Sequence, residues 1–388
     1  MRIALLCLFR IESCMRATRA IIHLGKLRAN IAAIRARVGA NTRICVPIKA
    51  DAYGHGAIRV AVAAIRSGAD HLAVASAQEG VELRESGIVA PILLLSLPLP
   101  EELPLVVAHR ITPLVSDVEF ARELSAVAVA SPESEKVAVH LKVDTGMGRV
   151  GCRPEEAATL ARSVDSLPQL SIAGTATHLA VSDSLDSSDI AYTEKQISAF
   201  RSAVESIRAA GINPGIIHAA SSGGVALHPS SWFDMVRPGI LIFGYPAAPG
   251  LEDRVPVEPV MELDTRIVFI KKVFAGESIS YGRSWVAERD TLVATLPIGY
   301  ADGLPRRLSG NMRVLIKETS YPVIGRICMD QCMVDLGPDS GVQRWDRAVL
   351  FGPDPRGPSA ADWARQLETI PYEITCAIDR RVPRVYLE

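Results

Sequence analysis

The stretch from residue 44 to residue 67 reads ICVPIKADAYGHGAIRVAVAAIRS, and it decides the fold we expect. It opens with a short apolar run, Ile44–Ile48, and ends in a segment of helical spacing, Ala57–Ser67. Seven more apolar runs follow at similar intervals: Leu72–Ala75, Ile92–Ser96, Ile111–Val115, Val137–Val143, Leu170–Thr177, Ile216–Ala220 and Met235–Phe243. Short apolar runs that alternate with helical segments predict an α/β fold built on parallel strands.

Eight evenly spaced strands predict a closed (β/α)8 barrel, the TIM barrel. The alternative is an open, doubly wound sheet. A Gly-x-Gly-x-x-Gly turn after the first strand would favour that sheet, and the sequence has none there. The other helical segments we expect are Gln78–Ser86, Pro100–Ala108, Asp117–Leu124, Pro154–Ser163 and Thr193–Ala209.

The pattern changes after about residue 256. Short β-branched segments follow, at Val260–Phe269, Thr291–Pro297, Met312–Ile316 and Met333–Leu336, and the next helical segment is Ser359–Leu367. We therefore expect the barrel over residues 15–256 and a mostly β C-terminal domain over residues 257–388, with a linker in Pro246–Pro259. We expect residues 1–14 to be a disordered extension or a start assigned too early, because Met15 begins a segment that resembles a natural start.

Composition narrows the class of partner. The formal net charge is -1 and hydrophobic residues make up 48% of the chain, which gives no reason to expect nucleic acid or a membrane as a partner. The seven cysteines include no Cys-x-x-Cys pair, which indicates reduced thiols and a cytoplasmic protein. Cys328 and Cys332 lie close in sequence but lack two further ligands nearby, so we expect no metal.

Reactive side chains follow several of the predicted strands. In such barrels the chemistry lies at the carboxyl ends of the strands. Lys49 follows the first run, and the loops after the seventh and eighth runs contain Ser221-Ser-Gly-Gly224 and Arg237-Pro-Gly-Ile240. Taken singly, Lys49 is equally well explained as a rim lysine that extends into solvent, and the Ser/Gly loop as an ordinary turn. Together, an amine and small phosphate-binding loops at one barrel mouth favour a phosphorylated aldehyde as cofactor.

With these residues in place, the chain resembles the alanine racemases from about Met15 to its end. The resemblance rests on six motifs in order: Val46-Pro-Ile-Lys-Ala-Asp-Ala-Tyr-Gly-His-Gly56, Lys142-Val-Asp-Thr-Gly-Met-Gly-Arg149, Ser280-Tyr-Gly-Arg283, Gly299-Tyr-Ala-Asp-Gly303, Gly325-Arg-Ile-Cys-Met-Asp330 and Arg381-Val-Pro-Arg384. Two positions depart from the family's usual pattern: Ser221, where Asn is common, and Asp379-Arg380, where small polar residues are usual. These departures leave substrate range less defined than reaction type.

The resemblance implies an enzyme that interconverts L-alanine and D-alanine by two-base proton transfer on pyridoxal 5'-phosphate. It implies that Lys49 carries the cofactor as a Schiff base and is the base for the D-enantiomer. It implies that Tyr281 is the base for the L-enantiomer and reaches the site from the partner subunit of a head-to-tail homodimer. Two bases on opposite faces exchange the α-proton without turning the substrate over.

The remaining roles follow from the same resemblance, position by position. Arg237 matches the arginine that contacts the pyridine nitrogen. Because an arginine keeps its own proton, the pyridine nitrogen would stay unprotonated. The phosphate-binding set is Tyr53, Ser222, Gly239, Ile240 and Tyr372, His178 lies against the pyridine ring, Arg149 and Met329 bind the substrate carboxylate, and Lys142 is a lysine that is often carbamylated. We further expect nearby cations, Arg149 and His178 among them, to lower the pKa values of the two bases.

Three alternatives remain open. A serine or broad-spectrum racemase would share the fold, although the bulky ring of Tyr372 favours a small substrate such as alanine. A fold-related pyridoxal phosphate decarboxylase would be expected to place an acidic residue where this chain has Arg237. A non-catalytic carrier of the cofactor would consist of the barrel alone, without a β domain or Tyr281.

Overall fold

The computed structural model describes residues 16–131 and 135–388, and the chain divides into two compact units. The barrel unit comprises Lys26–Ala52 and Gly56–Glu258. The sheet unit comprises the described residues up to Gly25, the short segment Tyr53–His55, and Pro259–Glu388. The expected extension over residues 1–14 lies outside the described residues.

The barrel unit contains a closed barrel of parallel strands, so the predicted fold class is confirmed. Its strands are β2 (Arg43–Pro47), β3 (His71–Val74), β4 (Ile92–Leu94), β5 (Thr112–Val115), β6 (Val137–Lys142), β7 (Leu170–Ala176), β8 (Ile216–His218) and β9 (Met235–Val236). Pairing of Arg43 with Met235 and of Ile44 with Val236 closes the ring between β2 and β9. Each strand falls within or beside a predicted apolar run. The eighth predicted run, Met235–Phe243, is much longer than its strand β9. The chain leaves the strand at Arg237 and turns through Gly239 and Ile240.

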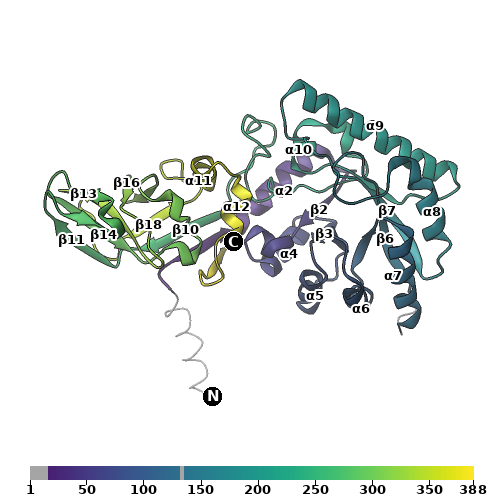
Figure 1. Cartoon of the computed structure of the whole chain (residues 1–388), viewed down its shortest axis with the longest axis horizontal. Coiled ribbons are helices and arrows are strands. Elements are labelled where there is room, and N and C mark those ends of the chain that lie inside the picture. Colours follow the sequence, from purple (N-terminus) through teal and green to yellow (C-terminus); the bar gives the residue numbers. More distant parts are fainter. Residues whose placement is uncertain (1–15, 132–134) are drawn as a thin grey trace, which may run out of the picture. The chain divides into compact units, whose positions relative to one another are not determined.

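Helices surround these strands (Figure 1). They are α2 (Leu24–Val38), α3 (Lys49–Tyr53), α4 (Ala57–Arg66), α5 (Ala77–Glu85), α6 (Leu103–Ala108), α7 (Val118–Ala130), α8 (Ala157–Asp165), α9 (Ser187–Ala209) and α10 (Ser222–Leu227), with short 3-10 turns η1 (Pro100–Glu102), η2 (Pro154–Glu156) and η3 (Pro229–Ser231). Side-chain caps explain some of the starts: Ser76 accepts the Glu79 N–H before α5, and Asp117 accepts the Phe120 N–H before α7.

Small and apolar side chains fill the inside of the barrel. A buried cluster joins Cys45, Ala73, Leu93, Leu114, Ala176 and Met235 from six different strands. Residues that pair side by side in neighbouring strands share a face of the sheet. The partners of cluster residues include polar ones: His140 on β6 pairs with Leu114, and Lys142 on β6 and His218 on β8 both pair with Ala176. All three polar side chains are buried. Polar groups therefore extend from the barrel interior toward the carboxyl ends of the strands.

The sheet unit is built on a nine-stranded sheet in the order β11-β14-β17-β16-β15-β18-β10-β1-β19. The strands are β1 (Arg19–His23), β10 (Met261–Arg266), β11 (Phe269–Val273), β14 (Thr291–Leu296), β15 (Arg313–Ile316), β16 (Thr319–Ile324), β17 (Cys332–Gly337), β18 (Arg347–Phe351) and β19 (Arg384–Leu387). A separate pair is formed by β12 (Ser278–Ile279) and β13 (Trp285–Val286), and the helical pieces are α11 (Ala360–Leu367), α12 (Pro371–Cys376), η4 (Tyr281–Arg283), η5 (Tyr300–Asp302) and η6 (Arg306–Leu308).

Strand β1 corrects the expected domain arrangement. We assigned residues 15–256 to the barrel, but β1 pairs antiparallel with β10 and parallel with β19 in the sheet unit. The start of the chain therefore supplies a strand to the domain that the end of the chain completes. The sequence pattern missed this strand because Arg19–His23 is short and continues directly into α2.

Candidate active site

Lys49 follows the last residue of β2 by two positions and is partly exposed. The backbone just after it is unusual, because Ala50, Asp51, Ala52 and Tyr53 have φ values of 53°, 51°, 53° and 55°. Four consecutive residues with a side chain thus form a left-handed turn, which costs on the order of 1–2 kcal/mol for each residue. Such strain persists where surrounding contacts over-determine the conformation, and it is concentrated at functional sites.

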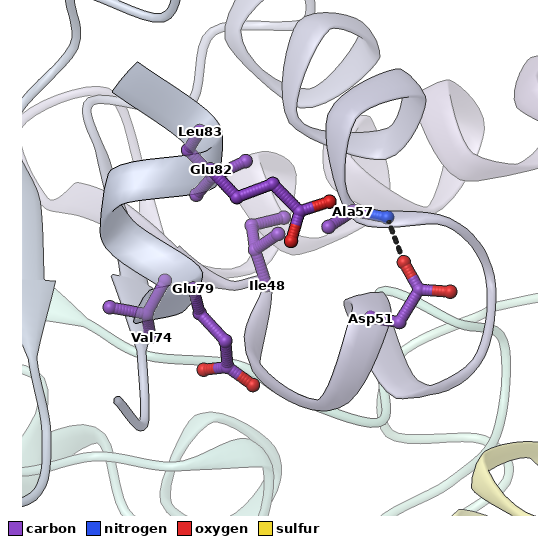
Figure 2. A pocket seen from close by; sticks show the side chains of 7 residues that line it. All are labelled: Ile48, Asp51, Ala57, Val74, Glu79, Glu82 and Leu83. Carbon is purple, nitrogen blue, oxygen red and sulfur yellow. Dashed lines mark hydrogen bonds between the residues drawn. The ribbon is translucent and has the colours of Figure 1, made fainter. Parts of the chain in front are cut away.

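Two carboxylates hold this turn. Glu79 Oε1 accepts the Ala50 N–H at 2.7 Å, while its other oxygen accepts the Ala75 N–H at 2.7 Å. Asp51 Oδ1 accepts the Ala57 N–H at 2.7 Å, drawn as the dashed line in Figure 2. Glu79 therefore fastens the turn after β2 to the loop after β3. The exact course of the chain around Lys49 depends on these side-chain bonds rather than on its own conformational preference.

Positive charge converges at the mouth of the barrel. Burial, followed by the charges of Arg237, Lys142, Arg149 and Lys49, holds the pKa of His178 well below its usual range. His178 is therefore neutral at physiological pH. Our expectation that a cationic His178 lowers the pKa values of the two bases is wrong, because burial and four neighbouring positive charges disfavour its protonation.

Arg237 is the most completely bonded of these cations. Its Nη1 donates to His218 Nδ1 at 2.6 Å, and its Nη2 donates to the carbonyl oxygens of Thr177 and Ala219 at 2.9 and 3.0 Å. Nη2 also lies 3.2 Å from His178 Nδ1. Burial lowers the pKa of Arg237 to about 10, so the guanidinium remains protonated at neutral pH. It is a fixed positive charge and a fixed set of donors.

Lys142 lies on the same rim. It is buried, and its burial, followed by the charge of Arg237, lowers the pKa of its amine to about 7. Near neutral pH this lysine is therefore partly uncharged, unlike an exposed lysine. Arg149 is exposed, and its charge also acts on Lys142. It follows a turn in which Asp144 Oδ1 accepts the N–H groups of Gly146 and Gly148.

The predicted phosphate-binding residues fall into two groups. In the barrel unit, Ser222 Oγ accepts the N–H groups of Gly239 and Leu241 at 2.9 and 3.4 Å, and Ile240 is completely buried. Glycine is required beside them, since a Cβ on Gly223 would lie 2.7 Å from the Ser182 carbonyl oxygen. Because the Ser222 hydroxyl already accepts two bonds, its own proton is available for an anion.

In the sheet unit, Tyr53 and Tyr372 form the second group. Their ring centroids are 5.7 Å apart, and burial raises the pKa of Tyr53 far above its usual value. Gly54 has a φ of 83°, and a Cβ there would lie 2.1 Å from the Thr375 carbonyl oxygen. The two tyrosines of the predicted phosphate-binding set therefore lie side by side, next to a close backbone contact between Gly54 and Thr375.

Tyr281 and Met329 also lie together, in the sheet unit. Both line a cavity of about 490 Å³ with Ser280, Cys328, Asp330 and Gln331. Tyr281 is 69% exposed and Met329 is 53% exposed, so both side chains are accessible in the single chain. Ser280 Oγ donates to the Arg326 carbonyl oxygen at 2.6 Å and so anchors the turn that presents Tyr281.

A buried carboxylate supports the Met329 loop. Asp302 is completely buried, forms ion pairs with Arg16 and with Arg381, and accepts the Gly299 N–H at 3.0 Å. The adjoining N–H groups of Tyr300 and Ala301 donate to the carbonyl oxygens of Cys328 and Met329, each at 3.0 Å. The motif at residues 299–303 therefore fixes the backbone around Met329.

Three further residues of the site were missed from the sequence. Glu79 carries a detectable signal, because Ser76-x-x-Glu79 is a capping-box pattern, but the bond to Ala50 joins separate loops. His140 and His218 each lie inside a predicted apolar run, and we predicted no role for either of them. Across residues 16–131 and 135–388, no group of three or more His, Cys, Asp or Glu side chains is placed to hold a metal ion.

Five cysteines in the described part of the chain are free thiols: Cys45, Cys152, Cys328, Cys332 and Cys376. No helix in that part combines the length and the apolar character that crossing a membrane requires.

Comparison with known proteins covers both units. Residues 22–247 match the family model "Alanine racemase, N-terminal domain", and residues 260–386 match "Alanine racemase, C-terminal domain". The chain is 54% identical to an alanine racemase of Treponema denticola, over 96% of this chain and 99% of the relative. It is 46% identical to that of Treponema pallidum, over 96% and 100%. Among solved structures, an alanine racemase of Clostridium difficile 630 superposes with a TM-score of 0.90 at 38% identity, covering 96% of both chains.

The left-handed turn leads to a first prediction. Glu79→Gln replaces an acceptor oxygen with an NH2 group that faces backbone N–H donors, leaving a donor unsatisfied. We expect the midpoint of thermal unfolding to fall, by the equivalent of about 1–3 kcal/mol. Glu82→Gln is the matched control, because Glu82 lines the same pocket in Figure 2 but makes none of these bonds. Equal unfolding midpoints for the two variants would show that Glu79 does not hold the turn.

Proposed function

The chain belongs to the alanine racemase family, and we propose that it interconverts L-alanine and D-alanine with two bases, Lys49 and Tyr281, on bound pyridoxal 5'-phosphate. The observation that carries the proposal is the convergence of four basic side chains on His178 at the barrel mouth. Such a concentration of positive charge requires anions, and a cofactor phosphate and a substrate carboxylate supply them.

The residues present fit this cofactor. The Ser222 hydroxyl has a proton to donate, and the adjoining turn at Gly239 and Ile240 is kept close by glycine packing. We propose that these residues, with Tyr53 and Tyr372, hold the phosphate and that Lys49 binds the aldehyde. When bound, pyridoxal phosphate withdraws electrons from the substrate's Cα and so makes its α-hydrogen acidic.

Arg237 distinguishes the proposed reaction from its rivals. Its guanidinium keeps its proton at neutral pH, so it can donate to the pyridine nitrogen but cannot protonate it. A carboxylate at this place would favour a protonated ring and stronger electron withdrawal, as we expected for a decarboxylase. Arg237 therefore supports racemisation, with neutral His178 packed against the ring as a non-competing neighbour.

The two bases have separate tasks. We propose that the Lys49 amine takes the α-proton of D-alanine and that the Tyr281 phenolate takes that of L-alanine, each returning a proton on its own face. Arg149 and the Met329 backbone N–H would bind the substrate carboxylate. The ring of Tyr372 would limit the side chain to a methyl group, which favours alanine over serine and larger amino acids.

We also propose a head-to-tail homodimer in which Tyr281 and Met329 serve the partner's site. Their exposure in the single chain, 69% and 53%, supports this, because a catalytic base needs a shielded position. The free thiols of the described cysteines support a cytoplasmic location. We propose small amino acids as the ligands and neither nucleic acid nor a membrane as a partner.

The direct test is an assay of D/L interconversion across a panel of amino acids, with and without added pyridoxal phosphate. We expect alanine to react fastest and its α-hydrogen to exchange with solvent deuterium. Release of carbon dioxide without exchange would establish a decarboxylase instead. Absence of both reactions, with the cofactor bound, would establish a carrier.

The two bases should respond differently to substitution. Lys49→Ala should remove both the yellow absorbance of the bound cofactor and the activity. Tyr281→Phe should keep the absorbance and slow exchange of the α-hydrogen of L-alanine at least tenfold more than that of D-alanine, since one proton-transfer partner contributes about 10²–10⁴-fold. Equal losses for the two enantiomers would reduce Tyr281 to a residue that only positions the substrate.

Shared sites make a further prediction about mixtures. Lys49→Ala and Tyr281→Phe homodimers should each be strongly impaired in racemisation in both directions, because interconversion uses both bases, but mixing and re-equilibrating them should restore part of the activity. Mixed dimers then contain one site with both native bases. The control is each variant mixed with itself under the same conditions. Unchanged activity, with subunit exchange verified by mass, would place both bases on one chain.

Lys142 supplies a pH-dependent prediction. We propose that its amine, whose pKa is lowered to about 7, reacts with carbon dioxide as the neutral form and becomes an anionic carbamate beside Arg149. At constant dissolved carbon dioxide, the carbamate signal in ¹³C spectra should rise from pH 6 to pH 8, because protonation below the pKa removes the reactive amine. Lys142→Arg should abolish the signal. A signal of constant intensity over this pH range would contradict the assignment.

A further inference from the structure

A pair of buried histidines lies inside the barrel, and the roles assigned above do not use it. His140 is on β6 and His218 is on β8, with exposed fractions of 3% and 0%. His140 Nδ1 lies 2.7 Å from His218 Nε2, and the rings meet edge to face with centroids 5.0 Å apart. Gly174 makes room for the pair, because a Cβ there would lie 2.6 Å from His140 Nδ1. A barrel interior normally holds branched apolar side chains here.

The hydrogen bonds of the histidine pair continue to Arg237, and the donor of each bond can be assigned. Arginine has no acceptor, so Arg237 Nη1 must donate to His218 Nδ1, which it meets at 2.6 Å. A neutral His218 then carries its proton on Nε2 and donates it to His140 Nδ1. Burial holds the pKa of His218 well below its usual range and lowers that of His140 to about 3, so both rings are neutral.

We propose that His140 is a positioning residue for Arg237, acting by fixing the tautomer of His218. This rests on the proposed function only in giving Arg237 its place at the pyridine nitrogen. With His140 as acceptor, His218 keeps Nδ1 free to receive the guanidinium proton. In the other tautomer, Nδ1–H would face the Nη1–H of Arg237, donor against donor, and a buried bond would be lost.

The other terminal nitrogen of the guanidinium, Nη2, also has hydrogen-bond partners. Nη2 is held by the carbonyl oxygens of Thr177 and Ala219, which fix one edge of the group. The bond from Nη1 to His218 fixes the second nitrogen and therefore the plane. None of these bonds uses Nε, which leaves that N–H available to the cofactor. Losing the Nη1 bond would let the plane rotate about Nη2 and misdirect this donor.

Two variants at residue 140 separate this role from simple core packing. His140→Asn places an amide oxygen close to the position of Nδ1 and keeps the acceptor, whereas His140→Leu fills the space without one. We expect kcat/KM and the affinity for pyridoxal phosphate to fall on the order of ten- to a hundredfold for His140→Leu, through an unsatisfied buried donor. His140→Asn should retain most of both. Leu114→Ala is the packing control, since Leu114 is the register partner of His140 on β5.

The decisive readout is the protonation of His218 itself. In enzyme labelled with ¹⁵N only in histidine, two-bond ¹H–¹⁵N spectra, assigned by His218→Asn, report which ring nitrogen carries the proton. We expect the Nε2–H tautomer in the wild-type, His140→Asn and Leu114→Ala proteins, and a changed or mixed tautomer in His140→Leu. An Nδ1–H tautomer in the wild type, or an unchanged one in His140→Leu, would overturn the proposal, and the wild-type result stands even where a variant fails to fold. The readout needs no turnover, so failure of the racemase assignment would be seen separately in the exchange assay.

Discussion

The buried guanidinium of Arg237 is the interaction on which the site depends. A permanent cation in a barrel interior is expensive unless its donors are satisfied, and here two backbone carbonyls and a neutral histidine satisfy them. The same charge lowers the pKa values of His178, His218 and Lys142 in combination with their burial. Burial and this fixed positive charge together therefore set the protonation of the groups around Arg237, and the electronic character proposed for the cofactor follows from the same guanidinium.

Much of the barrel can be predicted from the sequence, because the strands are short apolar runs and the helices are segments whose apolar residues recur at helical spacing. Lys49, Lys142, His178 and Arg237 could be placed at one rim for the same reason, since parallel strands in a barrel end together. What the pattern could not give is any feature that depends on bonds between distant segments. The bond between Ala50 and Glu79 is such a feature, and so is the pairing of β1 with β10 and β19.

The protonation states of the buried groups could not be predicted from the sequence either, because they depend on contacts between distant segments. His178 was expected to be one of the cations that lower the pKa values of the two bases, but its burial and the neighbouring positive charges make it neutral. His140 was invisible because one histidine in an apolar strand gives no sign of which nitrogen faces a partner. The left-handed turn after Lys49 was equally hidden, since alanine and aspartate adopt it only under external constraint. The sequence thus indicated which residues lie at the site, and the structure determined their protonation states and backbone conformations.

The placement of β1 has a consequence for how the polypeptide is made. On the ribosome, residues 19–23 emerge long before their sheet neighbours, residues 261–264 and 384–387. The barrel strands, which pair with near neighbours in sequence, can assemble while synthesis continues. The strand β1 must wait unpaired until β10 has been made, and its second edge stays open until β19 has been made. Completion of the nine-stranded sheet therefore requires residues 384–387, and a nascent chain that lacks them would leave β1 with an exposed edge.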